Sequence, residues 1–203
     1  MSAAPHPDVR GFLPDAEGRH LYALACEAAR TGPLLEIGSY CGRSTIWLAR
    51  AARVADTVVF AVDHHRGSEE HQPGELFHDP VLTDAEGCFD SLPEFRRNLA
   101  RDGVEDAVIP IISDAGSLAR YWQGSALGMV FIDGGHSLEA ALGDYRAWAP
   151  RIAPGGILAI HDVFPHPGQG GMAPYTIWQL AADSGLFAPL AQHGSLRALR
   201  RLG

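Results

Sequence analysis

Five short runs of the chain are apolar at nearly every position, and each is followed by polar or glycine-rich residues. A strand with both faces buried has this pattern, because neither face needs polar side chains for contact with solvent. The runs therefore predict five central strands of a largely parallel sheet. They cover Leu34–Ile37, Val58–Val62, Val108–Ile112, Met129–Ile132 and Ile157–Ile160.

Segments with the apolar spacing of amphipathic helices lie around and between these runs. Strands that alternate with helices predict an α/β fold, in which a mostly parallel sheet carries helices on both faces. After the last helix, Leu186–Ala191 and Leu196–Leu202 flank the turn signal His193-Gly194, which predicts an antiparallel hairpin at the sheet edge. The predicted helices are Ala16–Arg30, Ser44–Ala52, Leu92–Arg101, Ser117–Trp122, Ser137–Trp148 and Tyr175–Asp183.

Composition narrows the classes of partner. The chain has 203 residues, of which 46% are hydrophobic and 20% charged, so we expect residues 1–203 to form a single globular domain. Lys and Arg number 16 against 24 Asp and Glu, and the net charge of -8 argues against nucleic acid or an anionic membrane as partner. The three cysteines show no C-x-x-C spacing, and no targeting or membrane-spanning stretch is evident. We therefore expect a soluble, cytoplasmic protein.

The first predicted strand ends in the turn Glu36–Ser44, which reads E-I-G-S-Y-C-G-R-S. Gly38 and Gly42 allow a tight turn and a close approach of the backbone to a ligand. The dinucleotide fingerprint G-x-G-x-x-G fails, because Tyr40 and Arg43 stand where its second and third glycines belong. A nucleotide-like cofactor without a pyrophosphate is therefore favoured.

Polar residues follow the next two predicted strands as well. Asp63 offers a carboxylate to a ribose diol, and Ser113-Asp114 offers hydrogen bonds to an adenine edge. Together with the glycine turn, these residues resemble the S-adenosylmethionine site of class I methyltransferases, and the turn itself is similar to that of metal-dependent O-methyltransferases of the catechol and macrocin type.

The resemblance implies a Rossmann-like class I methyltransferase fold, with a mostly parallel seven-stranded sheet that ends in the antiparallel hairpin. It also implies S-adenosyl-L-methionine as the cofactor. The residues expected to contact the cofactor are Glu36, Gly38, Ser39, Tyr40, Gly42, Ser44, Asp63, Ser113, Asp114 and Asp133.

Asp133 and Asp162 follow the fourth and fifth predicted strands, so their carboxylates are expected to share one crevice. Two carboxylates make a hard oxygen site that suits Mg²⁺. In the family that the chain resembles, carboxylates at these two positions hold the metal, and an amide or carboxylate directly after the second completes the site. Here Val163 stands at that place, so His161, His136 or a water is expected to complete it. His161 could equally orient the carboxylates without touching the metal.

His136 lies three residues after Asp133, where the catechol-type relatives place a basic residue that takes the acceptor proton. An imidazole titrates near neutral pH, so we expect His136 to be the general base. The alternative is a helix-capping or merely exposed histidine.

The segment from Asp63 to His78 is rich in histidine, arginine and glutamate. We expect it to bind a hydroxylated acceptor such as a sugar, because buried hydroxyl groups need polar partners. The segment also resembles, more narrowly, actinobacterial sugar O-methyltransferases, including those of methylmannose polysaccharides. A separate transition-metal site at His64, His65, His71 and Glu70, or a solvated loop without a role, are the alternatives. The residues expected around the acceptor are His64, His65, Arg66, Glu70, His71 and Tyr175.

These observations predict an S-adenosylmethionine-dependent O-methyltransferase that acts on a small molecule or saccharide with the help of Mg²⁺. Methylation of a phenolic or nitrogen acceptor, a metal-dependent hydroxylase-like reaction and a cofactor-sensing binding module are the alternatives. No separate substrate domain is predicted, so selectivity depends on the loops or on a neighbouring subunit, and we expect a homodimer.

Overall fold

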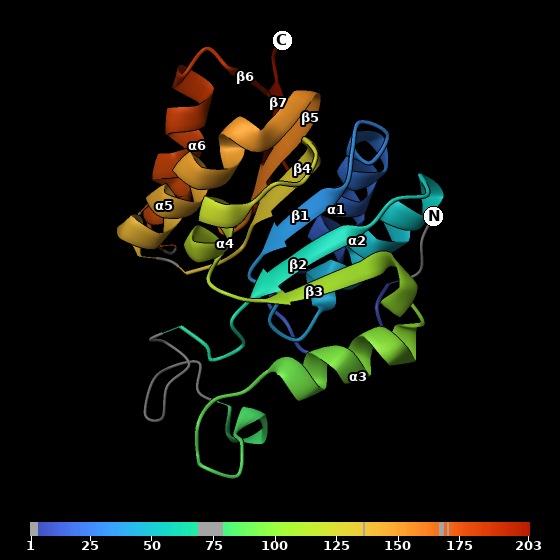
Figure 1. Cartoon of the computed structure of the whole chain (residues 1–203). Coiled ribbons are helices and arrows are strands. Elements are labelled where there is room, and N and C mark those ends of the chain that lie inside the picture. Colours follow the sequence, from blue (N-terminus) through green and yellow to red (C-terminus); the bar gives the residue numbers. More distant parts are fainter. Residues whose placement is uncertain (1–3, 69–78, 136, 167–168, 170) are drawn as a thin grey trace.

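Seven strands form one sheet in the order β3-β2-β1-β4-β5-β7-β6 (Figure 1). We describe the protein from a computed structural model, which covers residues 4–68, 79–135, 137–166, 169 and 171–203. Strands β1 to β5 are parallel, whereas β7 runs antiparallel to both β5 and β6. The strands are β1 (Leu34–Ile37), β2 (Val59–Asp63), β3 (Val108–Ile112), β4 (Leu127–Ile132), β5 (Ile152–Ile160), β6 (Phe187–Pro189) and β7 (Arg197–Arg201). The predicted fold class is confirmed.

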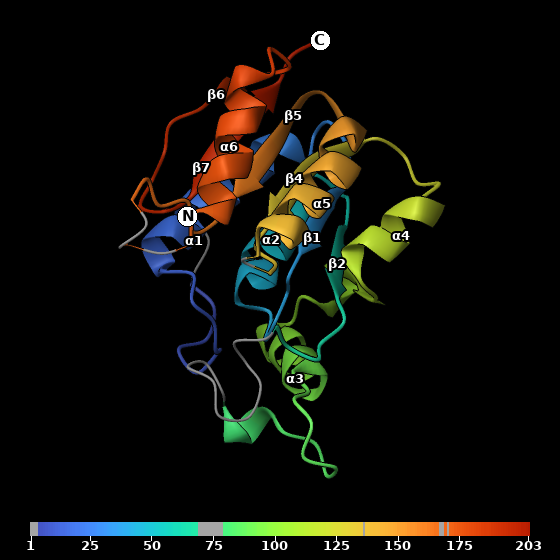
Figure 2. The same cartoon turned by 90° about the vertical axis from the view of Figure 1, so that its left-hand side faces the viewer.

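Helices cover both faces of the sheet (Figures 1 and 2). On one face, α1, α2 and α3 pack around the buried Trp47, and on the other α4, α5 and α6 pack around the buried Trp148. The helices are α1 (Asp15–Ala28), α2 (Arg43–Val54), α3 (Leu92–Asp102), α4 (Ala115–Tyr121), α5 (Leu138–Trp148) and α6 (Ala173–Asp183). Among the described residues, no helix is long and apolar enough to cross a membrane.

The direction in which successive strands are added to the sheet reverses between β1 and β4. From β1 the chain moves outward through β2 to β3, and it then returns to the other side of β1 to form β4 and β5. In open parallel sheets, loops diverge at such a reversal and leave a crevice beyond the carboxyl ends of the strands. The residues that follow β1 and β4 therefore face a common space.

Several elements differ from the sequence-based expectation, and three of the differences bear on the sheet and on the site. Strand β3 is not buried on both faces, because it is an edge strand with β2 as its neighbour, and Ile109 and Ile112 are 42% and 51% exposed. Strand β5 begins five residues earlier than expected, at Ile152. Helix α4 begins before Ser117, because the Asp114 side chain accepts a hydrogen bond from the Ser117 N–H at 2.7 Å and so caps the helix.

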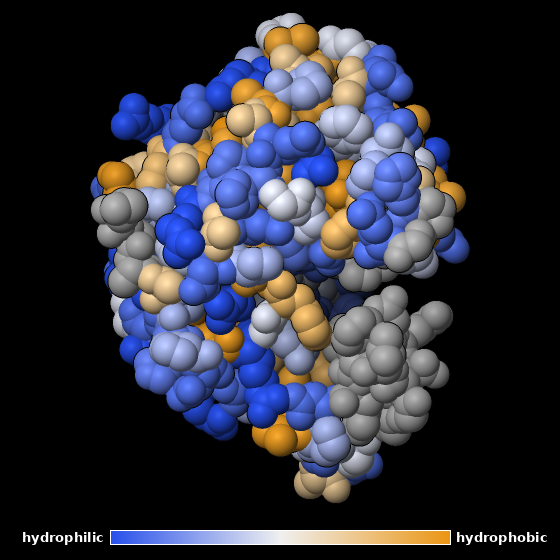
Figure 3. Space-filling view, turned by 180° about the vertical axis from the view of Figure 1, so that it is seen from behind, coloured by the Kyte–Doolittle hydropathy of each residue, from blue (hydrophilic) through white to orange (hydrophobic). Residues whose placement is uncertain are grey.

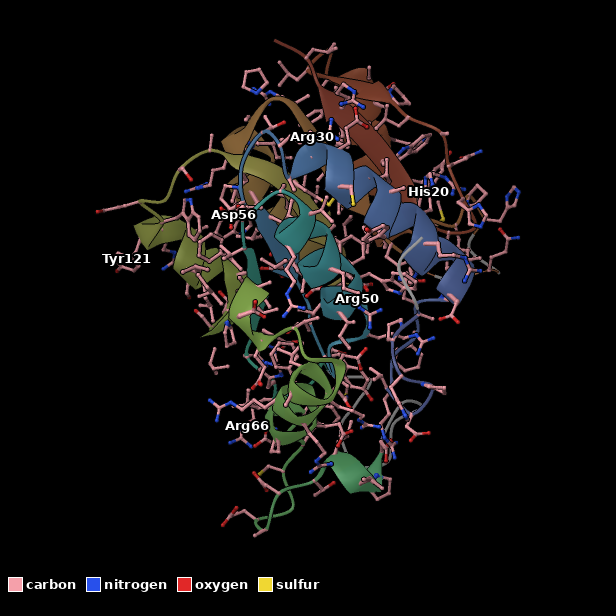
Figure 4. All side chains as sticks on the ribbon, turned by 90° about the vertical axis from the view of Figure 1, so that its right-hand side faces the viewer. His20, Arg30, Arg50, Asp56, Arg66 and Tyr121 are labelled. Carbon is pink, nitrogen blue, oxygen red and sulfur yellow. The ribbon has the colours of Figure 1, made fainter. Side chains whose placement is uncertain are left out.

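Arg43, at the first position of α2, binds the N-terminal segment (residues 4–14). Its Nε donates to the Leu13 carbonyl at 2.8 Å, and one terminal nitrogen donates to the Val9 carbonyl at 2.9 Å. The other terminal nitrogen pairs with Asp15 at 2.5 Å. A planar guanidinium can satisfy three acceptors at once, so this side chain holds the segment against α2. Farther along α2, Arg50 reaches Asp102 at the end of α3 (Figure 4).

We expect Arg43→Ala to lower the free energy of unfolding by about 1–3 kcal/mol, because it leaves buried carbonyl groups without donors. The matched control is Arg53→Ala on the same helix, which removes a solvent-exposed ion pair with Asp106 and an exposed hydrogen bond to the Gly103 carbonyl and should therefore cost less than Arg43→Ala. Urea denaturation of both variants measures the difference. Equal losses would show that Arg43 does not hold the segment.

Candidate functional site

A cavity of about 760 Å³ lies at the carboxyl ends of the parallel strands. The residues that follow the strands line it, and the N-terminal segment closes one side through Arg10–Leu13. Seen from behind, the molecular surface is hollowed at this edge (Figure 3). Of the residues expected at the cofactor and metal, those that line the cavity are Gly38, Ser39, Tyr40, Ser44, Asp63, Ser113, Asp114, Asp133 and Asp162.

Gly38 brings the end of β1 into contact with the end of β4. Its φ of 87° lies in the left-handed region, and a Cβ atom at this position would lie 2.2 Å from the Asp133 carbonyl oxygen. Only glycine can therefore occupy this position without moving the backbone. The Asp133 N–H in turn donates to the Ile37 carbonyl at 2.9 Å. These contacts place the Asp133 side chain beside the glycine turn, as the sequence predicted.

Asp63 joins the glycine turn to the loop after β2. One of its carboxylate oxygens accepts a hydrogen bond from the Tyr40 N–H at 2.8 Å, and the other accepts one from the His65 N–H at 2.7 Å. Each oxygen still has a lone pair, so the carboxylate can also accept hydrogen bonds from a diol in the cavity. Asp63 thus fixes the surrounding backbone and keeps its capacity to bind a ribose.

Glu36 lies beneath the turn and is fully buried, so it does not line the cavity. One of its oxygens accepts a hydrogen bond from the Thr45 hydroxyl at 2.5 Å. Burial raises the pKa of Glu36 to about 8, and hydrogen bonds from Ser44 and Thr45 oppose the rise. Its position supports a role in holding the start of α2 against β1 rather than a direct contact with a ligand.

Asp133 and Asp162 meet with His161 at the ends of β4 and β5. One ligand-type atom of each lies within 4.8 Å of the others. His161 Nδ1 lies 3.0 Å from Asp133 and 3.5 Å from Asp162. Val163, at the position of the family's third ligand, is buried in the core formed with α5 and α6. The two carboxylates fit a hard divalent cation, which in proteins is held by one or two carboxylates and several waters.

His161 is enclosed by acids on both sides of its ring. Nδ1 faces Asp133, and Nε2 lies 3.1 Å from the carboxylate of Glu17 on α1. Burial lowers the pKa of His161, but the neighbouring Asp133, Asp162 and Glu17 raise it more, to about 9. Each ring nitrogen lies within hydrogen-bond distance of a carboxylate, and His161 does not line the cavity. The geometry therefore favours the orienting role of His161 over the role of ligand.

The residues expected around the acceptor, in the loop after β2 and on α6, are only partly brought together. His64 lines the cavity, but His65 is buried, with Nδ1 2.8 Å from the Ser91 hydroxyl, and packs against Phe95. Arg66, labelled in Figure 4, pairs with Asp84 at 2.7 Å. Tyr175 packs against Trp178 at the surface of the core and does not line the cavity.

His65, Arg66 and Tyr175 therefore stabilise the loop and the core, and the structure does not place them where an acceptor would lie. The histidine-based transition-metal site stays a prediction, with the Nδ1 side of the His65 ring held by Ser91. His136, Glu70 and His71 lie outside the described residues.

Two groups of cavity residues were not anticipated. Phe12, which is 60% exposed, stacks on Tyr40 with ring centroids 5.9 Å apart, and Tyr40 stacks on Phe89 at 6.3 Å. Asp144 on α5 lines the cavity, and burial, with a smaller effect of Asp114, raises its pKa to about 7. The pattern of residues gave no signal for Phe12, because the N-terminal segment precedes all of the predicted elements.

A family model described as a methyltransferase domain matches residues 35–163, from β1 to the residue after Asp162. The match covers more than half of the chain. This protein belongs to the methyltransferase domain family. The membership that the sequence suggested is confirmed, and the cavity described above lies within the matched region except for the N-terminal segment and the loop after Val163.

Among curated proteins, this methyltransferase-family chain is similar to the catechol O-methyltransferase of Mycobacterium tuberculosis, with 32% identity over 146 residues. The alignment covers 72% of this chain and 54% of the relative, so the chain spans about half the length of that protein.

The solved structures share the whole architecture at low identity. The cofactor-bound protein Rv0187 from MTB has a TM-score of 0.68 at 20% identity, over 95% of this chain and 82% of the other. The O-methyltransferase TomG from Streptomyces achromogenes has a TM-score of 0.66 at 18% identity, over 97% and 83%. The O-methyltransferase from Bacillus cereus has a TM-score of 0.63 at 18% identity, over 96% and 84%. These likenesses show the Rossmann-like methyltransferase fold.

The raised pKa of Glu36 predicts a pH dependence of stability. Between pH 4.5, the ordinary pKa of a glutamate side chain, and about pH 8, the folded state binds more protons at this group than the unfolded state does. The free energy of unfolding therefore falls as pH rises through this window. We expect Glu36→Gln to remove this part of the pH dependence. Between pH 5 and pH 8, the free energy of unfolding should therefore fall less for the variant than for wild type.

Urea denaturation at several pH values measures this effect. Glu105→Gln, at an exposed acid in the connection before β3, is the matched control and should leave the slope unchanged. Parallel curves for wild type and Glu36→Gln would mean that Glu36 is already ionised in the folded protein at neutral pH.

Proposed function

We propose that the protein transfers a methyl group from S-adenosylmethionine to a hydroxyl oxygen of a small polar acceptor, with Mg²⁺ held by Asp133 and Asp162. One observation carries the proposal. A single cavity is lined both by the residues after β1, β2 and β3, which suit a nucleoside, and by the pair of carboxylates after β4 and β5. A site that holds the cofactor and the acceptor side by side supplies most of the rate acceleration that this displacement needs.

The cofactor half of the cavity is assigned to the residues around Asp63. The glycine turn gives the backbone close access to the cofactor, the Asp63 carboxylate would accept from the ribose hydroxyls, and Ser113 with Asp114 would meet the adenine. The TomG structure is described as a complex with SAM and the Bacillus cereus structure as a complex with SAH. Both likenesses support this choice of cofactor.

The acceptor half is assigned to Asp133, Asp162 and the histidines near them. Bound between the carboxylates, Mg²⁺ would lower the pKa of an acceptor hydroxyl and orient it. His161 would orient Asp133 through the hydrogen bond at Nδ1. We keep His136 as the proposed general base, because it follows Asp133 by three residues. The N-terminal segment and Phe12 would exclude water from this side of the cavity.

The acceptor is proposed to be a sugar or another hydroxylated metabolite, supported by the polar groups of the loop after β2. A phenolic acceptor is the second candidate, favoured by the exposed ring of Phe12 beside Tyr40 and by the similarity to a protein named catechol O-methyltransferase. The homodimer and the cytoplasmic location expected from the sequence stay predictions.

Transfer of labelled methyl groups to a panel of mono- and disaccharides and catechols tests the proposal. With the accepted substrate, we expect EDTA to abolish activity and Mg²⁺ to restore it. Asp133→Asn and Asp162→Asn should each lower kcat on the order of 100-fold, because each removes a charge that the cation needs. Asp106→Asn, at an exposed acid paired with Arg53, is the matched control and should retain activity.

Titration calorimetry with S-adenosylhomocysteine separates the parts of the proposal. Failure to bind it would refute the use of this cofactor. Activity that survives both EDTA and Asp133→Asn would remove the metal and leave the methyl transfer. His136→Ala should lower kcat and preserve binding of S-adenosylhomocysteine, and unchanged kcat would exclude it as the base.

A further inference from the structure

Three side chains from distant parts of the sequence form a buried chain of hydrogen bonds that ends at the cavity. His161 Nε2 lies within hydrogen-bond distance of the Glu17 carboxylate on α1, at 3.1 Å, and His161 Nδ1 lies 3.0 Å from the Asp133 carboxylate. The side chains of His161 and Glu17 are 2% and 9% exposed. Asp133 reaches the cavity, whereas Glu17 does not line it. Glu17 was not among the residues that the sequence suggested for the site.

The surrounding structure is shaped to hold Glu17 in place. The turn between β6 and β7 gives it two further donors, the Ser195 N–H at 3.0 Å and the Ser195 hydroxyl at 3.1 Å. Gly194, in the same turn, has a φ of 55°, and a Cβ there would lie 2.0 Å from the Glu17 carboxylate. On α1, a Cβ at Gly18 would lie 2.1 Å from Trp47 Nε1, so α1 packs closely on α2. The turn is thus fitted around the Glu17 carboxylate, and the close packing of α1 on α2 fixes the helix that carries it.

The two ring nitrogens of His161 lie on opposite sides of the ring, so a hydrogen-bond partner at each one fixes the plane of the ring. The backbone of Asp133 is already fixed by its hydrogen bond to Ile37 and by its packing on Gly38. The direction of its carboxylate then depends on His161. Without Glu17, the buried Nε2 would lose its hydrogen-bond partner, and the ring would turn toward another one.

We propose that Glu17 is a positioning residue of the methyl-transfer site, which acts through His161 to hold the Asp133 carboxylate toward the cavity. The inference rests on the proposed function where it treats Asp133 as a ligand of Mg²⁺. The hydrogen-bond chain itself can be tested without metal and without the acceptor.

The first test measures the proton on His161 Nδ1, on the side of the ring away from Glu17. Nitrogen-15 NMR of the full-length protein should show this proton, assigned by its loss in His161→Asn. We expect its exchange with water to be at least about tenfold faster in Glu17→Ala, because the ring is no longer fixed. Glu17→Gln keeps one acceptor oxygen and should show a smaller increase.

Ser195→Ala is the matched control. It removes one hydrogen bond from Glu17 but leaves the contact with His161, so exchange at Nδ1 should stay at the wild-type rate. Wild-type exchange in Glu17→Ala would overturn the proposal, as would an equal increase in Ser195→Ala. If Glu17→Ala does not fold, wild-type exchange in Glu17→Gln overturns it instead.

The second test measures the affinity for Mg²⁺ by calorimetry with S-adenosylhomocysteine bound. We expect Glu17→Ala to weaken Mg²⁺ binding at least about fivefold and to change the affinity for S-adenosylhomocysteine less than about twofold, as for a group behind a ligand. Unchanged Mg²⁺ affinity, despite faster exchange at Nδ1, would overturn the positioning role. If wild type binds no Mg²⁺, the metal part of the proposed function fails, and the NMR result alone decides the role of Glu17.

Discussion

The contact between Gly38 and the end of β4 is the constraint on which the site depends. With no side chain at Gly38, the turn after β1 lies directly against the Asp133 carbonyl. The residues proposed to bind a nucleoside and the residues proposed to face an acceptor are therefore parts of one cavity rather than of two. A larger residue at this position would separate the two halves, and a displacement reaction tolerates little separation because its rate depends on the alignment of the reacting atoms.

Charge is distributed unevenly around this contact. Five acids, Glu17, Glu36, Asp63, Asp133 and Asp162, line the cavity or lie buried below it, and their surroundings differ. Glu36 has its pKa raised by burial, Asp63 accepts backbone hydrogen bonds, and Glu17 and Asp133 share the ring of His161. The cavity thus keeps negative charge where a cationic sulfonium and a divalent cation are proposed to bind, and the buried acids below it are compensated by the protein.

The sequence predicted the strands and the residues at their carboxyl ends, because buried parallel strands and glycine turns leave local patterns. Gly38, Asp63, Asp133 and Asp162 were found in this way. Glu17 and Phe12 could not be found, since each reaches the site through contacts with residues far away in the sequence. The burial of His65 was missed for a related reason, because a polar residue in a polar loop gives no sign that it packs against Phe95. The edge position of β3 did leave a local signal, because Pro110 lacks the N–H that a strand with two neighbours would use for hydrogen bonding.

The insertion of β7 between β5 and β6 has a consequence for folding during synthesis. Strand β5, which ends at the acidic cluster, pairs with β4 on one side and with β7 on the other. Until residues 197–201 have left the ribosome, β5 is an open edge, and the turn that holds Glu17 does not exist. The centre of the sheet can form early, but the proposed acceptor side of the site is completed only after β7 has paired with β5. A nascent chain that already binds the cofactor would still lack that side of the site.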